Sequence, residues 1–397
     1  MTKYLANYAE CETLLFDSYP IDKISRNVLI IPAYKESFDF IQRFFLSVLA
    51  QQSVLVIVVI NQPDNEQNSF AQQKLYQQSL TLGDICWQNK NISLISVDKT
   101  DSLLLLVDRF TVPIPEKQGV GLARKIGADI AIKLMSQQQI TSKWLYSTDA
   151  DAHLPNNYFS VLNTVDKKCI VACFNFEHHS EHLATHRANL LYQTALQYYV
   201  EGLRYAGSKY AFYTIGSVLA FDSSAYAMVR GFPKRSAGED FYLTNKLAKL
   251  GDVTFIANCK ITIEARTSDR VPFGTGPAVS KILSLQNENK PYCYYHPDVF
   301  VLLKQTLTKF STVWEYRQQL DQWLVKLPVA IRNSLMTIGF NDFVKRQVDS
   351  KQNQFEKQLI VWFDAFKTLK FIHALRDQGY TDIPLSEAIT TANFIIH

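Results

Sequence analysis

The chain has 397 residues, of which 47% are hydrophobic and 13% aromatic, and this composition predicts two or three packed units rather than a disordered protein. Its 41 basic and 37 acidic residues leave a formal net charge of only +4, which excludes the broad basic field of a typical nucleic-acid-binding protein. The sequence shows neither a signal-peptide pattern nor a run of about 18 apolar residues, so we expect a cytoplasmic protein.

Apolar runs and helical patterns alternate through the first 150 residues. Strands are predicted at 27–34 and 54–63, where β-branched residues run uninterrupted, and residues 37–52 between them have apolar side chains at helical spacing. The next elements are a helix, a strand, a helix and a strand, at 69–82, 92–98, 119–139 and 144–149. We therefore expect an α/β fold, with a Rossmann-like, mostly parallel sheet flanked by helices, whose ligands bind beyond the carboxyl ends of the strands.

The alternation continues past residue 150 and then stops. The expected order is helix, strand, helix, strand, helix and strand, at 156–165, 169–176, 186–207, 217–222, 238–251 and 253–258. From about Tyr292 onward only helical patterns remain, including a long one at 353–378. The predicted organisation is an N-terminal segment at 1–26, an α/β domain at 27–290 and a C-terminal helical appendage at 291–397.

Two carboxylates one residue apart stand at the end of the strand at 144–149. The sequence there is STDADAHLP, which contains Asp149 and Asp151. Two such carboxylates can bind one divalent cation, and oxygen ligands suit Mg²⁺ or Mn²⁺. An ordinary acidic turn gives the same pair of residues, so the neighbouring motifs must decide between the two interpretations.

Four motifs in a fixed order supply that context. They are IIPAYKES at the end of the first strand, GVGLARKIGAD at the helix 119–139, STDADAHLP, and SAGEDFYLTNKLAKLG. Together, over residues 27–276, they resemble glycosyltransferase family 2, whose members use a GT-A fold. The resemblance implies sugar transfer from a nucleoside diphosphate sugar with Mn²⁺ or Mg²⁺ as cofactor. It also implies a nucleotide-sugar-binding half at 27–151 and an acceptor half at 152–290.

The resemblance further implies which residues hold the nucleotide sugar. Asp149 and Asp151 would bridge sugar, diphosphate and metal, and Arg124 would help to hold the nucleotide. The expected nucleotide-sugar set is Pro32, Ala33, Tyr34, Glu36, Asn61, Lys117, Arg124, Asp149, Ala150, Asp151 and Arg270. Two positions depart from the family pattern, because Asn61 stands where a base-contacting acid is common and Lys125 stands where the motif has an asparagine.

A second acidic pair, Glu239 and Asp240, matches the family motif near the acceptor. An acceptor hydroxyl needs a base to take its proton, and Asp240 is the expected catalytic base, with Glu239 contacting the acceptor or orienting Asp240. One carboxylate on the face opposite the leaving group would give inversion. Taken alone, the pair could instead stabilise a helix N-terminus. The residues expected to bind the acceptor are Gly216, Ser217, Arg235 and Gly238.

Three further segments have two interpretations each. His296 would be a metal ligand supplied from a late segment, or a packed histidine. The loop at 266–278 would be a lid with Arg270 on phosphate, or a plain surface loop. We interpret His178, His179, His182 and His186 as part of the polar start of a helix, in preference to a metal site.

The leading functional prediction is a metal-dependent inverting glycosyltransferase with an unidentified hydroxyl acceptor. The alternatives are a retaining enzyme of the glycosylglycerate-synthase type and a catalytically inactive nucleotide-sugar-binding module. No nucleic-acid partner is expected. The aromatic side chains of 357–376 would pack against the catalytic domain or form a homodimer, or else would touch the cytoplasmic side of a membrane.

Overall fold

The computed structural model describes residues 1–265 and 274–396. The chain divides into two compact units, each built from two stretches of sequence. The first unit contains residues 1–186 and 214–277, and the second contains residues 187–213 and 278–397. Residues 187–213, which the sequence pattern placed in the α/β domain, are therefore part of the helical second unit.

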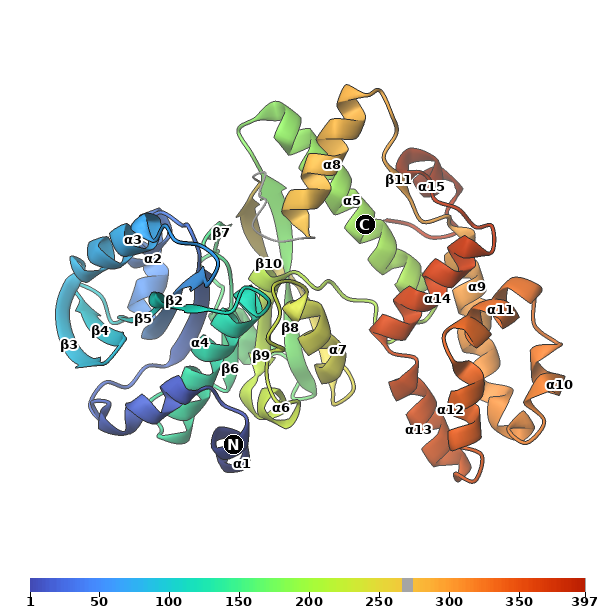
Figure 1. Cartoon of the computed structure of the whole chain (residues 1–397), viewed down its shortest axis with the longest axis horizontal. Coiled ribbons are helices and arrows are strands. Elements are labelled where there is room, and N and C mark those ends of the chain that lie inside the picture. The colour runs from blue at the N-terminus through green and yellow to red at the C-terminus, as the bar shows by residue number, and fades with distance from the viewer. Residues whose placement is uncertain (266–273, 397) are drawn as a thin grey trace. The chain divides into compact units, whose positions relative to one another are not determined.

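The first unit is built on one sheet of ten strands (Figure 1). In chain order the strands are β1 Asn27–Ala33, β2 Val54–Pro63, β3 Gly83–Asn89, β4 Ile92–Val97, β5 Leu103–Ile114, β6 Trp144–Ser147, β7 Ala152–His153, β8 Cys169–His179, β9 Leu219–Asp222 and β10 Asp252–Glu264. Across the sheet their order is β3-β4-β5-β2-β1-β6-β9-β8-β10-β7. Within the described part of the chain, β4, β7 and β9 run opposite to all the others. The expected α/β fold with a mostly parallel sheet is confirmed.

One edge of the sheet differs from the prediction. The strand expected at 92–98 is β4, but it pairs antiparallel with both β3 and β5 instead of extending the parallel alternation. The turn after β4 is tight, with Lys99 at a φ of +58°, and it returns the chain directly into β5. β5 lies between β4 and β2 in the sheet, and its apolar first five residues are buried.

Helices of the first unit pack against this sheet, with α4 on β1 and β2 and with α3 on β2 and β5. The helical segments of this unit are α1 Thr2–Asn7, η1 Cys11–Ser18, α2 Asp39–Leu46, η2 Val48–Gln51, α3 Phe70–Leu80, α4 Gly119–Ser136, η3 Ser160–Thr164, η4 Gly216–Val218, α6 Ser223–Met228 and α7 Glu239–Leu247. The helix predicted at 37–52 is interrupted after Leu46, because the Ser47 side chain accepts a hydrogen bond from the Leu49 N–H and starts a separate turn. The helix predicted at 156–165 is only the short 3-10 turn η3.

The second unit is helical, apart from a short two-stranded ladder. Its elements, several of which appear in orange and red in Figure 1, are most of α5 Leu183–Tyr205, then α8 Thr275–Asn287, β11 Cys293–Tyr294, α9 Asp298–Lys309, η5 Phe310–Tyr316, α10 Leu320–Leu324, α11 Val329–Thr337, α12 Phe340–Arg346, α13 Gln352–Trp362, α14 Ala365–Asp377, β12 Ile383–Pro384 and α15 Leu385–Thr391. Its core gathers Tyr198 from α5, Phe300 from α9, Phe340 from α12 and Phe371 from α14, all fully buried.

The long helix predicted at 353–378 is divided into α13 and α14. The break follows Phe363, and Asp364 caps α14 by accepting a hydrogen bond from the Lys367 N–H at 3.0 Å. Phe363 and Phe371 are buried within this unit, so much of the apolar face is covered by the unit's own helices. Among the described residues, no helix combines the length and apolar character needed to cross a membrane.

Candidate active site at the end of β6

The predicted acidic motif follows β6 at the centre of the sheet. The Thr148 N–H donates to the carbonyl oxygen of Ile30 in β1 at 3.1 Å, which continues the pairing of β6 with β1 by one residue. The Thr148 hydroxyl donates to the carbonyl oxygen of Ser217 in η4 at 2.9 Å. These two hydrogen bonds fix the backbone immediately before Asp149 and so restrict where its carboxylate can lie.

Arg124 of α4 lies at the centre of a cluster of polar groups. Its side chain is 3% exposed, and it donates from Nε to Glu239 at 2.9 Å and from Nη2 to Asp149 at 2.6 Å. From Nη1 it donates to the Ser147 hydroxyl at 2.8 Å and to the Thr148 carbonyl oxygen at 3.3 Å. Burial by itself would lower the pKa of Arg124, but the charges of Asp149 and Glu239 raise that pKa overall, so the guanidinium stays ionised.

A close approach to Gly216 places the Arg124 side chain. A Cβ atom on Gly216 would lie only 2.4 Å from Nη2 of Arg124, so no other residue fits at position 216 without moving the guanidinium. The neighbouring Ser217 is 2% exposed. Among the residues expected to bind the acceptor, Gly216 is therefore packed against the arginine, and Ser217 is buried next to it in the chain.

The second acidic pair begins α7. Gly238 adopts a left-handed conformation with a φ of +71° at the N-cap, and Glu239 follows as a buried residue with an exposed fraction of 4%. Asp240 is half-buried and accepts a hydrogen bond from the Phe241 N–H at 2.7 Å. Burial, followed by the negative charge of Glu239, raises the pKa of Asp240 from 3.8 to about 8. Asp240 therefore carries a proton at neutral pH in the free protein.

The loop that leads into α7 lies directly on the start of α4. The Gly121 N–H donates to the carbonyl oxygen of Arg235 at 2.9 Å, and a Cβ on Gly121 would lie 2.4 Å from the carbonyl oxygen of Pro233. A Cβ on Gly119 would likewise lie 2.7 Å from Cα of Ser236. The exposed guanidinium of Arg235 stacks on the Tyr242 ring at 4.1 Å. Glycines in α4 thus let the loop approach the helix backbone.

The residues expected to contact the nucleotide lie near the ends of two adjacent strands and at the start of α4. Pro32 and Ala33 are buried in β1, and β2 lies beside them in parallel register with Asn61, which is 5% exposed, near its end. Tyr34 and Glu36 follow β1 and are half-buried. Lys117 is exposed in the turn before α4. β1, β2 and β6 are consecutive neighbours with one direction, so these residues and Asp149 share one edge of the sheet.

The donor chemistry of Asp149 and Asp151 suits a divalent cation. Arg124 bonds Oδ1 of Asp149, whose side chain remains 34% exposed, and Asp151 is half-buried two residues later. Ala150 between them is 7% exposed, and its carbonyl oxygen accepts a hydrogen bond from Arg43 of α2 at 3.0 Å. Over residues 1–265 and 274–396, no group of three or more His, Cys, Asp or Glu side chains is arranged so that it could hold a metal ion.

The remaining candidate ligands belong to other segments of the chain, one of them in the second unit, or are outside the described residues. His296 belongs to the second unit, where its Nδ1 accepts a hydrogen bond from the Asp298 N–H at 3.2 Å. Arg270 is outside the described residues, as is most of the proposed lid, and the last residues of that segment, 275–278, belong to α8. The four histidines are divided between the end of β8, the connection after it and α5, with the His179 and His186 rings 5.6 Å apart.

Sequence patterns did not single out Ser147, Thr148 or Arg43. Ser147 and Thr148 belong to the strand end that carries the acidic motif, so position in the chain was the available signal for them. Arg43 is distant in sequence from the residues it holds, donating to the carbonyl oxygens of Ala150 and Ala152 at 3.0 and 3.2 Å. Only the fold brings it to the motif.

The protein is therefore an α/β protein with a cluster of one arginine and several carboxylates at the carboxyl edge of its sheet. No protein-family model matches the sequence, and no curated protein matches it. Among solved structures, residues 1–349 of S. aureus TarS in complex with UDP-GlcNAc align at 8% identity over 89% of this chain and 92% of that chain, with a TM-score of 0.40. The mannosyltransferase PcManGT from Pyrobaculum calidifontis, in complex with GDP-Man and Mn²⁺, aligns at 12% identity over 98% of this chain and 87% of that chain, with a TM-score of 0.37. At these scores, membership of a particular family stays a prediction.

Proposed function

We propose that the protein is a glycosyltransferase that moves a sugar from a nucleoside diphosphate sugar to a hydroxyl acceptor with inversion. The observation that carries this proposal is the buried Arg124, which bonds at once to Asp149 of the acidic motif and to Glu239 beside the expected base. An acidic turn and a helix N-terminus that served only local structure would not need a common cation between them. Their connection supports one active site with a donor side and an acceptor side.

Each acidic residue has a separate task in this proposal. Asp240 takes the proton of the acceptor hydroxyl as the hydroxyl oxygen attacks the anomeric carbon. Glu239, held by Arg124, fixes the start of α7 and adds the negative charge that makes Asp240 a stronger base. Arg124 donates four hydrogen bonds to protein groups, so its role is to position Asp149 and Glu239 rather than to bind the nucleotide alone.

Asp149 and Asp151 are the residues that would hold Mn²⁺ or Mg²⁺ together with the diphosphate. A divalent cation there supplies positive charge to the departing nucleoside diphosphate. Pro32, Tyr34 and Asn61, at the ends of β1 and β2, would contact the base and ribose.

The test is release of a nucleoside diphosphate from candidate nucleotide sugars in the presence of Mn²⁺ or Mg²⁺. We expect Asp149→Asn and Asp240→Asn each to lower the rate by roughly 100-fold or more, the range for loss of one catalytic group. The matched control is Asp84→Asn, at an exposed position in β3, which should retain the wild-type rate. Full activity in either site variant would refute the assignment, and a product with the donor's anomeric configuration would refute inversion.

A further inference from the structure

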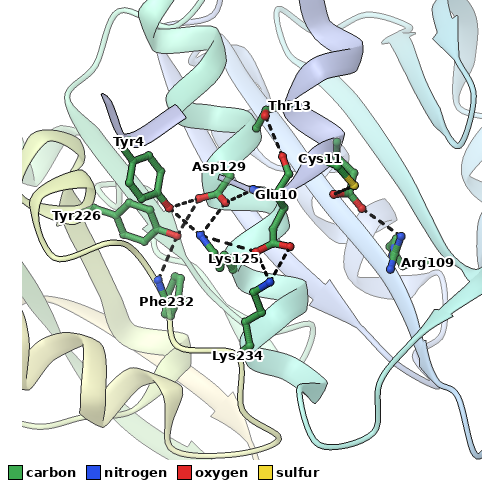
Figure 2. A network of polar contacts seen from close by, with 11 residues as sticks. Tyr4, Glu10, Cys11, Thr13, Arg109, Lys125, Asp129, Tyr226, Phe232 and Lys234 are labelled. Atoms are coloured by element: carbon green, nitrogen blue, oxygen red, sulfur yellow. Dashed lines mark hydrogen bonds and ion pairs between the residues drawn. The ribbon is translucent and has the colours of Figure 1, made fainter. Parts of the chain in front are cut away.

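The first part of the N-terminal segment is joined to α4 by a buried polar network (Figure 2). At its centre is Asp129, whose exposed fraction is 0%. This carboxylate accepts hydrogen bonds from the Tyr4 hydroxyl at 2.5 Å, from Nζ of Lys125 at 2.8 Å and from the Glu10 N–H at 2.9 Å. Nζ of Lys125 also donates to the Tyr4 hydroxyl at 2.8 Å. The buried charge of Asp129 would be destabilising without these hydrogen bonds, so the network favours one position of residues 4–10 against α4.

The same network reaches the loop that precedes α7. The Tyr226 hydroxyl donates to Asp129 at 3.3 Å and accepts from the Phe232 N–H at 3.3 Å. Gly231 has a φ of +71°, and a Cβ atom there would lie 2.4 Å from the Tyr4 hydroxyl. Figure 2 shows both tyrosine rings converging on Asp129, with Phe232 just beyond Tyr226. The start of the loop therefore contacts the N-terminal segment through Tyr4 and is linked to α4 through the Tyr226 hydroxyl.

The middle and the end of this loop are attached to the same two elements. Nζ of Lys234 lies 2.8 Å from Glu10, and the Arg235 carbonyl oxygen accepts from the Gly121 N–H at 2.9 Å. Lys234 is 42% exposed, so its ion pair adds little, and the buried tyrosines supply the main attachment. At the far end of the loop, Glu239 is held by Arg124.

We infer that the network of Tyr4, Lys125, Asp129 and Tyr226 positions the loop at 231–238, and through it the Glu239–Asp240 pair. The inference rests on the proposed function, in which Asp240 is the base. Arg124 and Lys125 are consecutive residues of α4, and one holds the end of the loop while the other supports its start. The four network residues touch neither donor nor acceptor in this proposal and act as positioning residues.

The experiment compares Tyr226→Phe and Tyr4→Phe in the full chain, because each removes one hydroxyl and keeps the packed ring. The matched control is Tyr76→Phe, which removes the 2.9 Å hydrogen bond between α3 and Ser93 of β4 in the same unit. Hydrogen exchange of the free protein is measured for the amides of 231–238. Steady-state kinetics then give kcat and KM for the donor sugar. The exchange measurement needs no substrate, so it is independent of the proposed activity.

We expect the loop amides to exchange roughly tenfold faster in Tyr226→Phe and Tyr4→Phe and at the wild-type rate in Tyr76→Phe. We expect kcat to fall roughly tenfold in the two network variants while the donor KM stays unchanged, since misplacing a base affects the reaction and not donor binding. Unchanged exchange in both network variants overturns the inference, and so does faster exchange with an unchanged kcat. A wild-type protein without transferase activity would reject the proposed function, whereas the exchange data would still show whether the network restrains the loop.

Discussion

Arg124 shows how far sequence reasoning reaches at the scale of a residue. The resemblance to glycosyltransferase family 2 pointed to Arg124, Asp149 and Glu239 separately, and the structure joins them through hydrogen bonds of 2.6 and 2.9 Å. The sequence could not reveal that pairing, because the residues come from α4, the end of β6 and the start of α7. To the role implied by resemblance, helping to hold the nucleotide, our proposal adds the positioning of two carboxylates.

Asp240 leads to a prediction about pH. Because burial and Glu239 raise the pKa of Asp240 to about 8, the base is protonated in most free molecules at neutral pH. We expect kcat/KM to rise as the pH increases through about 8, since this ratio reports the ionisation of the free enzyme. The measurement is a pH profile of kcat/KM under saturating divalent cation. A profile that is flat between pH 6 and pH 9 would contradict the raised pKa.

The same shift affects stability, and its sign follows from linkage. The unfolded chain has an ordinary aspartate pKa near 3.8, and folding raises that pKa, so folding favours the protonated carboxyl. This contribution is present in full below the unfolded pKa and is lost as the pH rises through about 8. Asp240→Asn should therefore gain stability over the wild type between pH 4 and pH 8 in urea unfolding, even though it loses activity. Asp84→Asn, at an exposed position, is the control and should show no such trend.

At the scale of elements, α4 connects the sheet to the site. Gly127 faces the sheet, and a Cβ atom there would lie 2.6 Å from Cγ2 of Ile30 in β1. The close approach places the helix, and with it Arg124 one turn earlier. Within a helix, alanine is normally more favourable than glycine by about 1 kcal/mol. If Gly127→Ala loses stability, steric overlap with β1 therefore outweighs the gain in helix propensity.

We expect Gly127→Ala to destabilise the protein by about 1–3 kcal/mol, the usual cost of overpacking a core. Ile30→Ala removes the opposing methyl group and should by itself cost about 2–4 kcal/mol through the cavity that it leaves. The double variant should lose less stability than the sum of the losses in the two single variants, because the new methyl group partly fills the new cavity. Urea unfolding of the four proteins gives the coupling energy. Additive costs would mean that α4 does not contact β1 as described.

Elements with long, uniform patterns were predictable, and those set by a single local hydrogen bond or turn were not. β1, β2 and α4 have bounds close to their apolar patterns. The helix at 37–52 is interrupted because the Ser47 hydroxyl competes for the Leu49 N–H. The helix at 353–378 is divided in the same way by Asp364, whose carboxylate bonds the Lys367 N–H. Propensity averaged over a window does not detect such a local competitor.

At the scale of the whole molecule, the division of the chain into two units has a consequence for its fragments. The core of the second unit includes Ala195, Tyr198 and Leu203 from α5, far in sequence from its other members. A Cβ atom on Gly202 of α5 would lie 2.6 Å from the Phe300 ring, so the helix and α9 are tightly packed. A boundary drawn at residue 290 separates these partners.

We therefore expect a fragment of residues 291–397 to lack a cooperative unfolding transition, because its core has lost α5. Joining residues 187–213 to residues 278–397 through a flexible linker should restore the transition. Near-ultraviolet circular dichroism during heating measures both. A sharp transition in the shorter fragment would show that α5 contributes little to the unit.

The adjacency of Arg124 and Lys125 constrains the length of the chain in this region. Each residue in an α-helix turns the next by about 100°, so inserting or deleting one residue between positions 121 and 129 rotates part of α4 by that angle. Either Arg124 would leave Asp149 and Glu239, or Lys125 would leave its place beside Asp129. Homologues that keep this site should therefore vary freely in length at exposed turns such as the one between β3 and β4, and should keep the register of α4 unchanged.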